Sequence, residues 1–175
     1  MPVQSLDLEQ YIRPIPDWPK PGILFRDITP LLADHEAYLA AVDAMVSDYK
    51  GMPIDYVAAV EARGLIFGSA VAERLKAGFI PIRKQGKLPY TTESYTYDLE
   101  YGTDTLEIHV DAIQRGNQIL LVDDLLATGG TMEAACKLIE QVGGHIAGVS
   151  CLIELVDLGG RAKLKPYKIR TVVTY

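Results

Sequence analysis

The chain has 175 residues, of which 49% are hydrophobic and 23% charged, a composition that suits one globular domain with a substantial core. Its net charge of −6, without a long run of Lys and Arg, argues against binding to nucleic acid or to an anionic membrane. No apolar run approaches the ~18 residues of a membrane span and the N-terminus lacks a secretion signal, so we expect a cytoplasmic protein.

The first third of the chain predicts two helices separated by an irregular stretch. Ser5 is placed to cap a short helix that continues to Ile12. Four prolines then predict an extended, non-helical path past Trp18: Pro14, Pro16, Pro19 and Pro21. Asp34 is placed to cap a second helix, whose apolar face carries Leu39, Val42, Val46 and Tyr49.

From residue 56 onward, apolar strands alternate with helical patterns. Strands are predicted at 56–60, 79–82, 105–110, 119–122, 146–155 and 169–173, with helices at about 65–76 and from 132 to 142. This alternation predicts a doubly wound α/β fold with a mainly parallel sheet, whose ligands bind at the carboxyl ends of the strands. Cys136 and Cys151 are expected to be small core residues rather than a disulfide or a metal pair.

The loop after the strand at 56–60 is a candidate anion site. It reads Glu61, Ala62, Arg63 and Gly64, and it opens a helix. Gly64 permits close approach of the backbone, and Arg63 offers a forked donor to phosphate oxygens. An ordinary turn with a surface arginine is the alternative.

Residues 90–101 are rich in tyrosine, threonine and acids but poor in aliphatic side chains. Between two strands, such a stretch is either a flexible lid that excludes water from a site or a solvated hairpin whose tyrosines cover one face. The residues alone favour the hairpin.

Residues 119–131 are the most informative segment, because an apolar strand there leads into two carboxylates and a small-residue loop that opens a helix. The backbone N–H groups of that loop can converge on a phosphate: Ala127, Thr128, Gly129, Gly130 and Thr131. No Lys precedes Thr131, which excludes a nucleotide-triphosphate P-loop. Asp123 and Asp124 would repel a phosphate chain unless Mg²⁺ or sugar hydroxyls intervene, so the pattern indicates a ribose 5-phosphate site. The alternative is an acidic strand end followed by an ordinary glycine turn.

The same segment resembles the phosphoribosyl diphosphate (PRPP) signature of the type I phosphoribosyltransferases. Four other stretches are similar to the adenine phosphoribosyltransferase family and follow its order over nearly the whole chain. These stretches are residues 21–30, 61–64, 83–89 and 99–102.

The resemblance implies a purine salvage enzyme that transfers the 5-phosphoribosyl group from PRPP to adenine and releases AMP and diphosphate. It implies Mg²⁺ as a cofactor, held through diphosphate, ribose hydroxyls and water rather than directly by the protein, and it implies a homodimer. It also implies a single domain over 1–175, with an N-terminal base-binding hood at 1–33 and a flexible lid loop at 88–104.

The resemblance also implies a role for each candidate residue. Glu100 and Arg63 would be catalytic, Glu100 by handling a proton at the base and Arg63 by stabilising the leaving diphosphate. Asp123 and Asp124 would hold the ribose hydroxyls, and residues 127–131 the 5′-phosphate. The diphosphate would contact Glu61, Ala62, Arg63, Gly64, Arg83, Lys84 and Lys87, in a loop for which the family suggests a cis peptide at Glu61–Ala62. Adenine would contact Leu24, Phe25, Arg26 and Leu125.

Other functions stay open at this point. A phosphoribosyltransferase for another purine is one, although many 6-oxopurine enzymes carry an acid where this chain has Ala127. A non-catalytic PRPP-binding regulator of the same fold is another, and it would usually need a basic face or an added DNA-binding domain. Without the resemblance, Leu24, Phe25 and Leu125 would be ordinary core residues.

Overall fold

The structure, a computed structural model, describes residues 6–99 and 102–175, and these fall into two compact units divided between Ala44 and Met45. Each unit is described by itself. None of the helices within the described ranges has the length and apolar character that crossing a membrane requires.

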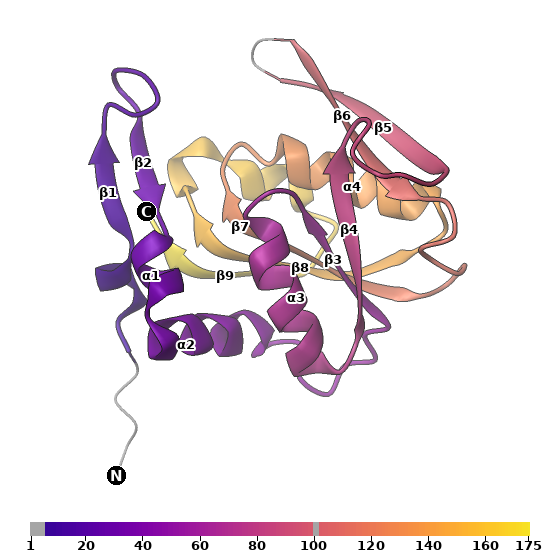
Figure 1. The fold of residues 1–175 in the computed structure, drawn as a ribbon, viewed down its shortest axis with the longest axis horizontal. Helices are drawn as coiled ribbons and strands as arrows, with labels where there is room; N and C mark the ends of the chain where they lie inside the picture. Colours follow the sequence, from indigo (N-terminus) through magenta and orange to yellow (C-terminus); the bar gives the residue numbers. More distant parts are fainter. Residues whose placement is uncertain (1–5, 100–101) are drawn as a thin grey trace. The chain divides into compact units, whose positions relative to one another are not determined.

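The first unit contains a hairpin and two helices (Figure 1). Its elements are the short 3₁₀ helix η1 (Leu8–Tyr11), strands β1 (Arg13–Pro16) and β2 (Leu24–Asp27), and helices α1 (Thr29–Ala33) and α2 (His35–Val46), which continues past the division. The strands pair antiparallel, with Arg13 opposite Asp27. The predicted extended path is confirmed, but it is a regular hairpin. Prolines fit there because a two-stranded sheet has only edge strands.

Aspartates cap two of these helices. The Asp7 carboxylate accepts a hydrogen bond from the Glu9 amide at the start of η1, and Ser5, which the sequence suggested as the cap, lies outside the described residues. The Asp34 Oδ1 atom accepts a hydrogen bond from the Ala37 amide at 2.9 Å, which confirms the predicted cap of α2.

The second unit is a seven-stranded sheet with helices on both faces (Figure 1). In chain order its elements are β3 (Tyr56–Val60), α3 (Gly64–Leu75), β4 (Gly78–Lys84), β5 (Thr92–Asp98), β6 (Thr103–His109), β7 (Gln118–Leu126), α4 (Gly130–Gln141), β8 (His145–Glu154), the 3₁₀ helices η2 (Val156–Leu158) and η3 (Gly160–Leu164), and β9 (Ile169–Thr174). The strand order is β5-β6-β4-β3-β7-β8-β9. The strands from β4 to β9 in that order are parallel, and β5 and β6 are antiparallel additions. The predicted doubly wound, mainly parallel α/β fold is confirmed.

Helices α3 and α4 cover opposite faces of this sheet. Successive side chains of a strand point to opposite faces, so the two helices pack against alternate residues of the strands. Ala58, Val60 and Leu121 belong to the core on the α4 face, together with both cysteines, which are fully buried as predicted. On the other face, Gly68 of α3 lies directly on β3 and β4, where an added Cβ would be 2.9 Å from the Phe79 ring. Figure 1 shows α3 in front of the sheet and α4 behind it.

The strand order changes direction between β3 and β7. From this central pair the chain continues to β4 on one side and to β8 on the other, so the carboxyl ends of β3 and β7 form the topological switch point of the sheet. Their register pairs Tyr56 with Ile119 and Ala59 with Val122. The Glu61 loop and the two carboxylates of β7 therefore lie at the same edge.

Most of the segment predicted as a lid loop is a strand. Residues 92–98 form β5, which pairs with β6 from Thr92 opposite His109 to Asp98 opposite Thr103. Tyr95 and Tyr97 lie two residues apart and pack against the core on the α4 face. These residues therefore form the hairpin that their composition alone favoured, and its tyrosines pack on one face. A lid function of the hairpin stays a prediction, and Glu100 lies outside the described residues.

Candidate active site

A pocket of about 360 Å³ lies at the switch point, within the second unit. Its wall consists of Glu61, Ala62, Arg63, Lys84, Asp123, Asp124, Leu125, Ala127, Thr128, Gly129, Gly130, Thr131 and Met132. The structure thus brings together the two loops that the sequence suggested as anion sites, although 60 residues of chain separate Arg63 from Asp123.

The two carboxylates lie inside β7 rather than after it, because the strand continues to Leu126. The Asp123 Oδ1 atom accepts a hydrogen bond from the Asp124 amide at 2.8 Å. Gly64, the first residue of α3, packs against this carboxylate so closely that a Cβ would lie 2.6 Å from Asp123 Oδ1. Gly64 does not line the pocket. Its lack of a side chain instead lets α3 approach β7.

An ion pair connects the Glu61 loop to strand β7. The Nε atom of Arg63 lies 2.8 Å from Oδ2 of Asp124, whose side chain is 8% exposed. Burial raises the pKa of Asp124, and the positive charge of Arg63 opposes that rise. Burial and the negative charge of Asp124 both raise the pKa of Asp123. Two adjacent buried carboxyls are stabilised by groups that donate hydrogen bonds, and the hydroxyls of a sugar are such groups.

Glu61 is fixed by the chain that follows β4. The Glu61–Ala62 peptide bond is cis, as expected from the resemblance. The side chain accepts hydrogen bonds from the Lys84 amide at 2.5 Å and from the Arg83 guanidinium at 3.0 Å. Burial alone would raise the pKa of Glu61, but these two hydrogen bonds outweigh burial and hold the pKa below its ordinary value.

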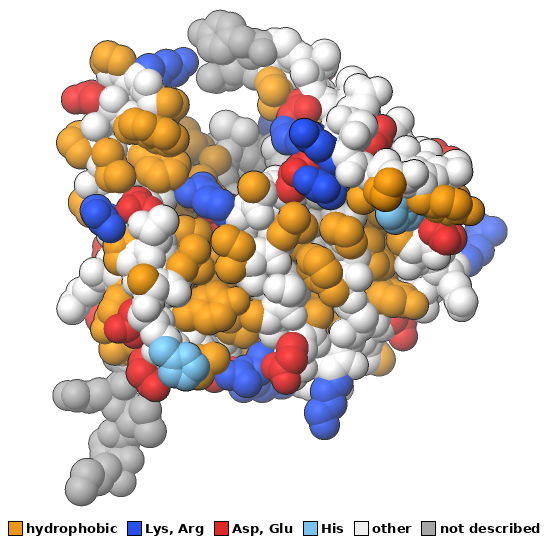
Figure 2. Space-filling model, in the orientation of Figure 1, with side chains coloured by type: hydrophobic (Ala, Val, Ile, Leu, Met, Phe, Trp, Pro, Cys, Tyr) orange, Lys and Arg blue, Asp and Glu red, His pale blue; other side chains and the backbone are white. Residues whose placement is uncertain are grey.

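Three of the basic residues predicted to bind diphosphate lie within the 83–89 stretch, and they are placed differently. Only Lys84 lines the pocket. Arg83 donates one hydrogen bond to Glu61 and another to the Lys87 carbonyl oxygen at 3.3 Å. It therefore fixes the Glu61 loop without lining the pocket. Lys87 does not line the pocket. In Figure 2, acidic and basic side chains gather over the end of β4 and the start of β6. The ion pairs Arg83–Glu61 and Lys84–Asp104 lie there.

Two residues of the β5–β6 hairpin contact the pocket wall and were not suggested by the sequence. Asp104 of β6 forms an ion pair with the Lys84 ammonium group. The hydroxyl of Tyr97 lies 3.4 Å from the Asp104 carboxylate and hydrogen-bonds with the Thr131 hydroxyl at 3.2 Å. This chain of contacts connects the start of α4 to Lys84. Only the position of Tyr97 in an alternating strand could have indicated it.

The glycine loop presents an uncapped helix N-terminus to the pocket. Among the described residues, no side chain caps α4, so its first amides and the positive end of its dipole stay available to an anion. Gly129 has a φ of 81°, and a Cβ there would lie 2.6 Å from the Gly160 carbonyl oxygen. Both the turn and the packing therefore require glycine at this position.

The residues proposed for the base lie in both units. Leu24, Phe25 and Arg26 form most of β2, and Leu125 lines the pocket. Leu24 is 47% exposed, so it is not a core residue. The ring of Phe25 packs edge to face on Trp18, with 4.4 Å between the ring centres.

Comparison with known proteins gives a consistent family. The phosphoribosyl transferase domain matches residues 31–174. The adenine phosphoribosyltransferase of Rhodopirellula baltica is 57% identical over 174 residues, which are 99% of this chain and 84% of that protein. The crystal structure of adenine phosphoribosyltransferase from Thermoanaerobacter pseudethanolicus has a TM-score of 0.93 at 49% identity and covers 96% of this chain and 98% of its own. The Saccharomyces cerevisiae enzyme, complexed with an imino-altritol bisphosphate and adenine, has a TM-score of 0.90 at 35% identity and covers 96% and 97%.

A doubly wound sheet with paired carboxylates and a glycine loop at its switch point is the architecture of a phosphoribosyltransferase. With these relatives, the chain belongs to the adenine phosphoribosyltransferase family, which confirms the resemblance found in the sequence.

Proposed function

We propose that this chain catalyses purine salvage by transferring the 5-phosphoribosyl group from PRPP to adenine, with AMP and diphosphate as products. One observation carries the proposal: Asp123 and Asp124 line the same pocket as the uncapped amides of residues 127–131. Acceptors for sugar hydroxyls thus lie next to donors for a phosphate, which is the chemistry of a ribose 5-phosphate. The relatives, and the adenine held by the yeast enzyme, support the choice of base.

The protein would act mainly by position and charge. Departure of diphosphate from the ribose leaves positive charge on the sugar ring and negative charge on the leaving group. Arg63 and Lys84 line the pocket and would stabilise the diphosphate, while the two aspartates hold the ribose hydroxyls. Arg83 acts as a positioning residue, because its contact with Glu61 fixes the loop that carries Arg63. Lys87 would reach the diphosphate only from outside the pocket wall.

Mg²⁺ fits this pocket as a companion of the substrate. Within the described ranges, no three His, Cys, Asp or Glu side chains cluster in a way that could hold a metal ion. Asp123 and Asp124 nevertheless offer carboxylate oxygens, the ligand chemistry that Mg²⁺ prefers, and would hold its water molecules while the diphosphate and ribose supply the direct ligands. A bound Mg²⁺ supplies positive charge that offsets the charge on the leaving diphosphate.

The contacts with the base are those that the family resemblance implies. Main-chain groups at Leu24 and Arg26 would pair with the edge of adenine, Phe25 would support them, and Leu125 would cover a face of the ring. Glu100 would handle the proton at the base. We further propose that the enzyme works in the cytoplasm as a homodimer. Two buried, free cysteines are consistent with a reducing compartment.

A competition assay tests the proposed function. The protein is incubated with PRPP, Mg²⁺ and equal concentrations of adenine, hypoxanthine, guanine and xanthine, and the nucleotides formed are measured. We expect AMP to dominate, because Ala127 supplies no acid for a 6-oxopurine and mispaired polar groups can cost a factor of about 10⁴. Comparable rates with a 6-oxopurine would contradict adenine specificity alone. Binding of PRPP without any nucleotide product would instead identify a regulator.

A further inference from the structure

Helix η3 packs directly against the glycine loop of the pocket. A Cβ on Gly160, the first residue of η3, would lie 2.9 Å from the Gly129 amide nitrogen and would overlap with the Ala127 carbonyl group. In turn, a Cβ on Gly129 would lie only 2.6 Å from the Gly160 carbonyl oxygen. The backbones of the two segments are therefore in contact, and η3 restricts the conformation of the glycine loop.

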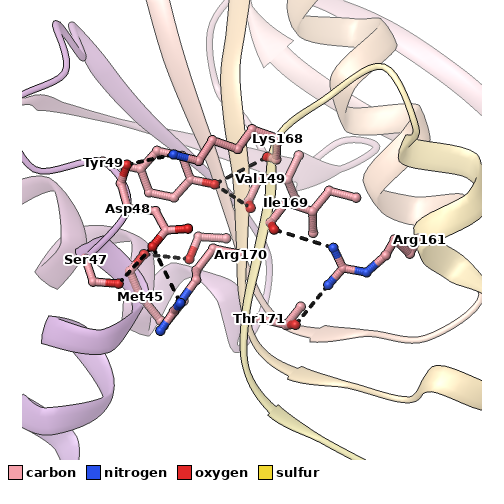
Figure 3. A network of polar contacts seen from close by, with 11 residues as sticks. Met45, Ser47, Asp48, Tyr49, Val149, Arg161, Lys168, Ile169, Arg170 and Thr171 are labelled. Atoms are coloured by element: carbon pink, nitrogen blue, oxygen red, sulfur yellow. Dashed lines mark hydrogen bonds and ion pairs between the residues drawn. The ribbon is translucent and has the colours of Figure 1, made fainter.

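The position of η3 is fixed from both of its sides. The Arg161 guanidinium binds the Glu154 carboxylate through two hydrogen bonds, of 2.9 and 2.6 Å, and donates to the Thr171 hydroxyl at 3.0 Å. Figure 3 shows Arg161 reaching Ile169 and Thr171 of β9. Leu164, at the other end of η3, is fully buried in the core on the α4 face. Residues between these anchors are held in place relative to the loop.

Lys163 lies between the anchors and points at the start of α4. Its Nζ atom is 3.9 Å from the position that a Cβ would take on Gly130, while the Tyr97 ring lies 4.0 Å from the same position. Lys163 is exposed and, among the residues that the structure describes, forms no ion pair or hydrogen bond. Lys84 and Arg63, by contrast, are each paired with an aspartate.

We propose that Lys163 is a phosphate-binding residue, whose ammonium group contacts the 5′-phosphate of the nucleotide held by residues 127–131. The inference rests on the proposed function, which places that phosphate at the α4 N-terminus. An anion bound to the amides of Gly129 to Thr131 lies within reach of the flexible lysine side chain. Asp123 and Asp124 carry negative charge beside it, so an additional unpaired cation offsets their repulsion of the phosphate.

The test compares ligands that differ in the phosphate. AMP and adenosine are titrated by calorimetry into the wild-type protein and the Lys163→Met, Lys163→Arg and Lys165→Met variants, in low and high salt. Lys165 is the matched control, because it is an exposed lysine two residues further along, at the end of η3, and it does not line the pocket. Thermal unfolding of each variant is measured in parallel.

We expect Lys163→Met to weaken AMP binding about tenfold, the lower end for a lost hydrogen bond between charged groups. The loss should shrink in high salt because a partly exposed charge is screened. Adenosine binding and the melting temperature should not change, Lys163→Arg should restore most of the AMP affinity, and Lys165→Met should match the wild type. Wild-type AMP affinity in Lys163→Met, or an equal loss for AMP and adenosine, overturns this assignment while leaving the proposed function intact. Failure of the wild-type protein to bind AMP overturns both.

Discussion

Replacing both carboxylates of β7 should separate stability from binding. In the variant with Asp123→Asn and Asp124→Asn, each side chain keeps its shape and an oxygen that accepts hydrogen bonds, but the negative charges are removed. The variant removes the ion pair of Asp124 with Arg63, whose side chain is 34% exposed and can be hydrated in its place. The variant therefore alters the pocket without opening a cavity.

The sign of the stability effect follows from the pKa directions. The pKa values of both carboxyls are raised by burial, so the folded protein binds protons more readily than the unfolded chain. Any stability that these groups contribute is present below the unfolded pKa and is lost as the pH rises through the folded pKa. Above the folded pKa values the charged pair thus opposes folding, and the double variant, which cannot ionise, should unfold at the same temperature as the wild type or higher.

The binding effect has the opposite sign. A hydrogen bond from a hydroxyl contributes about 1.5–3 kcal/mol to a carboxylate but about 0.5–1.5 kcal/mol to a neutral amide, so the weakening of two such bonds should reduce AMP and PRPP affinity by roughly 10–100-fold. Calorimetry with AMP and a thermal unfolding scan measure both quantities. Unchanged AMP affinity would refute the ribose assignment, and a clearly lower melting temperature would refute the electrostatic argument.

Four further predictions concern the proposed site and the core of the second unit. Because burial raises the pKa values of Asp123 and Asp124, AMP affinity should fall as the pH is lowered from neutral. The double variant should not show this fall, and the same pH dependence of AMP affinity in both proteins would contradict the prediction. Arg63→Ala should reduce PRPP affinity by about 1.5–3 kcal/mol and AMP affinity by less, measured by competition binding; equal losses would argue against a diphosphate role. Glu100→Gln should lower single-turnover rates while adenine affinity stays nearly constant, and unaltered rates would remove Glu100 from the chemistry. Gly148→Ala should cost about 1–3 kcal/mol of stability in urea unfolding, since its Cβ would lie 2.7 Å from the Tyr49 hydroxyl, which donates a hydrogen bond to the Val149 carbonyl oxygen (Figure 3); a stability equal to the wild type would show that Tyr49 moves without cost.

Where local pattern and tertiary environment agree, the fold could be predicted from the sequence. The strand at 56–60 is a continuous apolar run because both of its faces are covered, and its bounds are correct. Strand β5 is different, because polar side chains cover one face and tyrosines the other. Its composition favours a hairpin, but the bounds and register of its pairing with β6 are tertiary properties that composition does not reveal.

The candidate site was predictable as two loops but not as one electrostatic unit. The glycine loop and the carboxylates carry recognisable local spacing. That Arg63 pairs with Asp124, and that Arg83 supports Glu61, depends on the parallel register of β3 with β7 and with β4. The same holds for Tyr97 and Asp104, which reach the pocket only because β5 and β6 extend the sheet beside β4.

A crystal structure of the protein with AMP would show directly whether the pocket binds a ribose 5-phosphate. We expect the 5′-phosphate to lie on the amides of residues 127–131 and the ribose hydroxyls to donate hydrogen bonds to Asp123 and Asp124. A nucleotide bound with its phosphate elsewhere, or with its ribose turned away from both carboxylates, would rule out the proposed site.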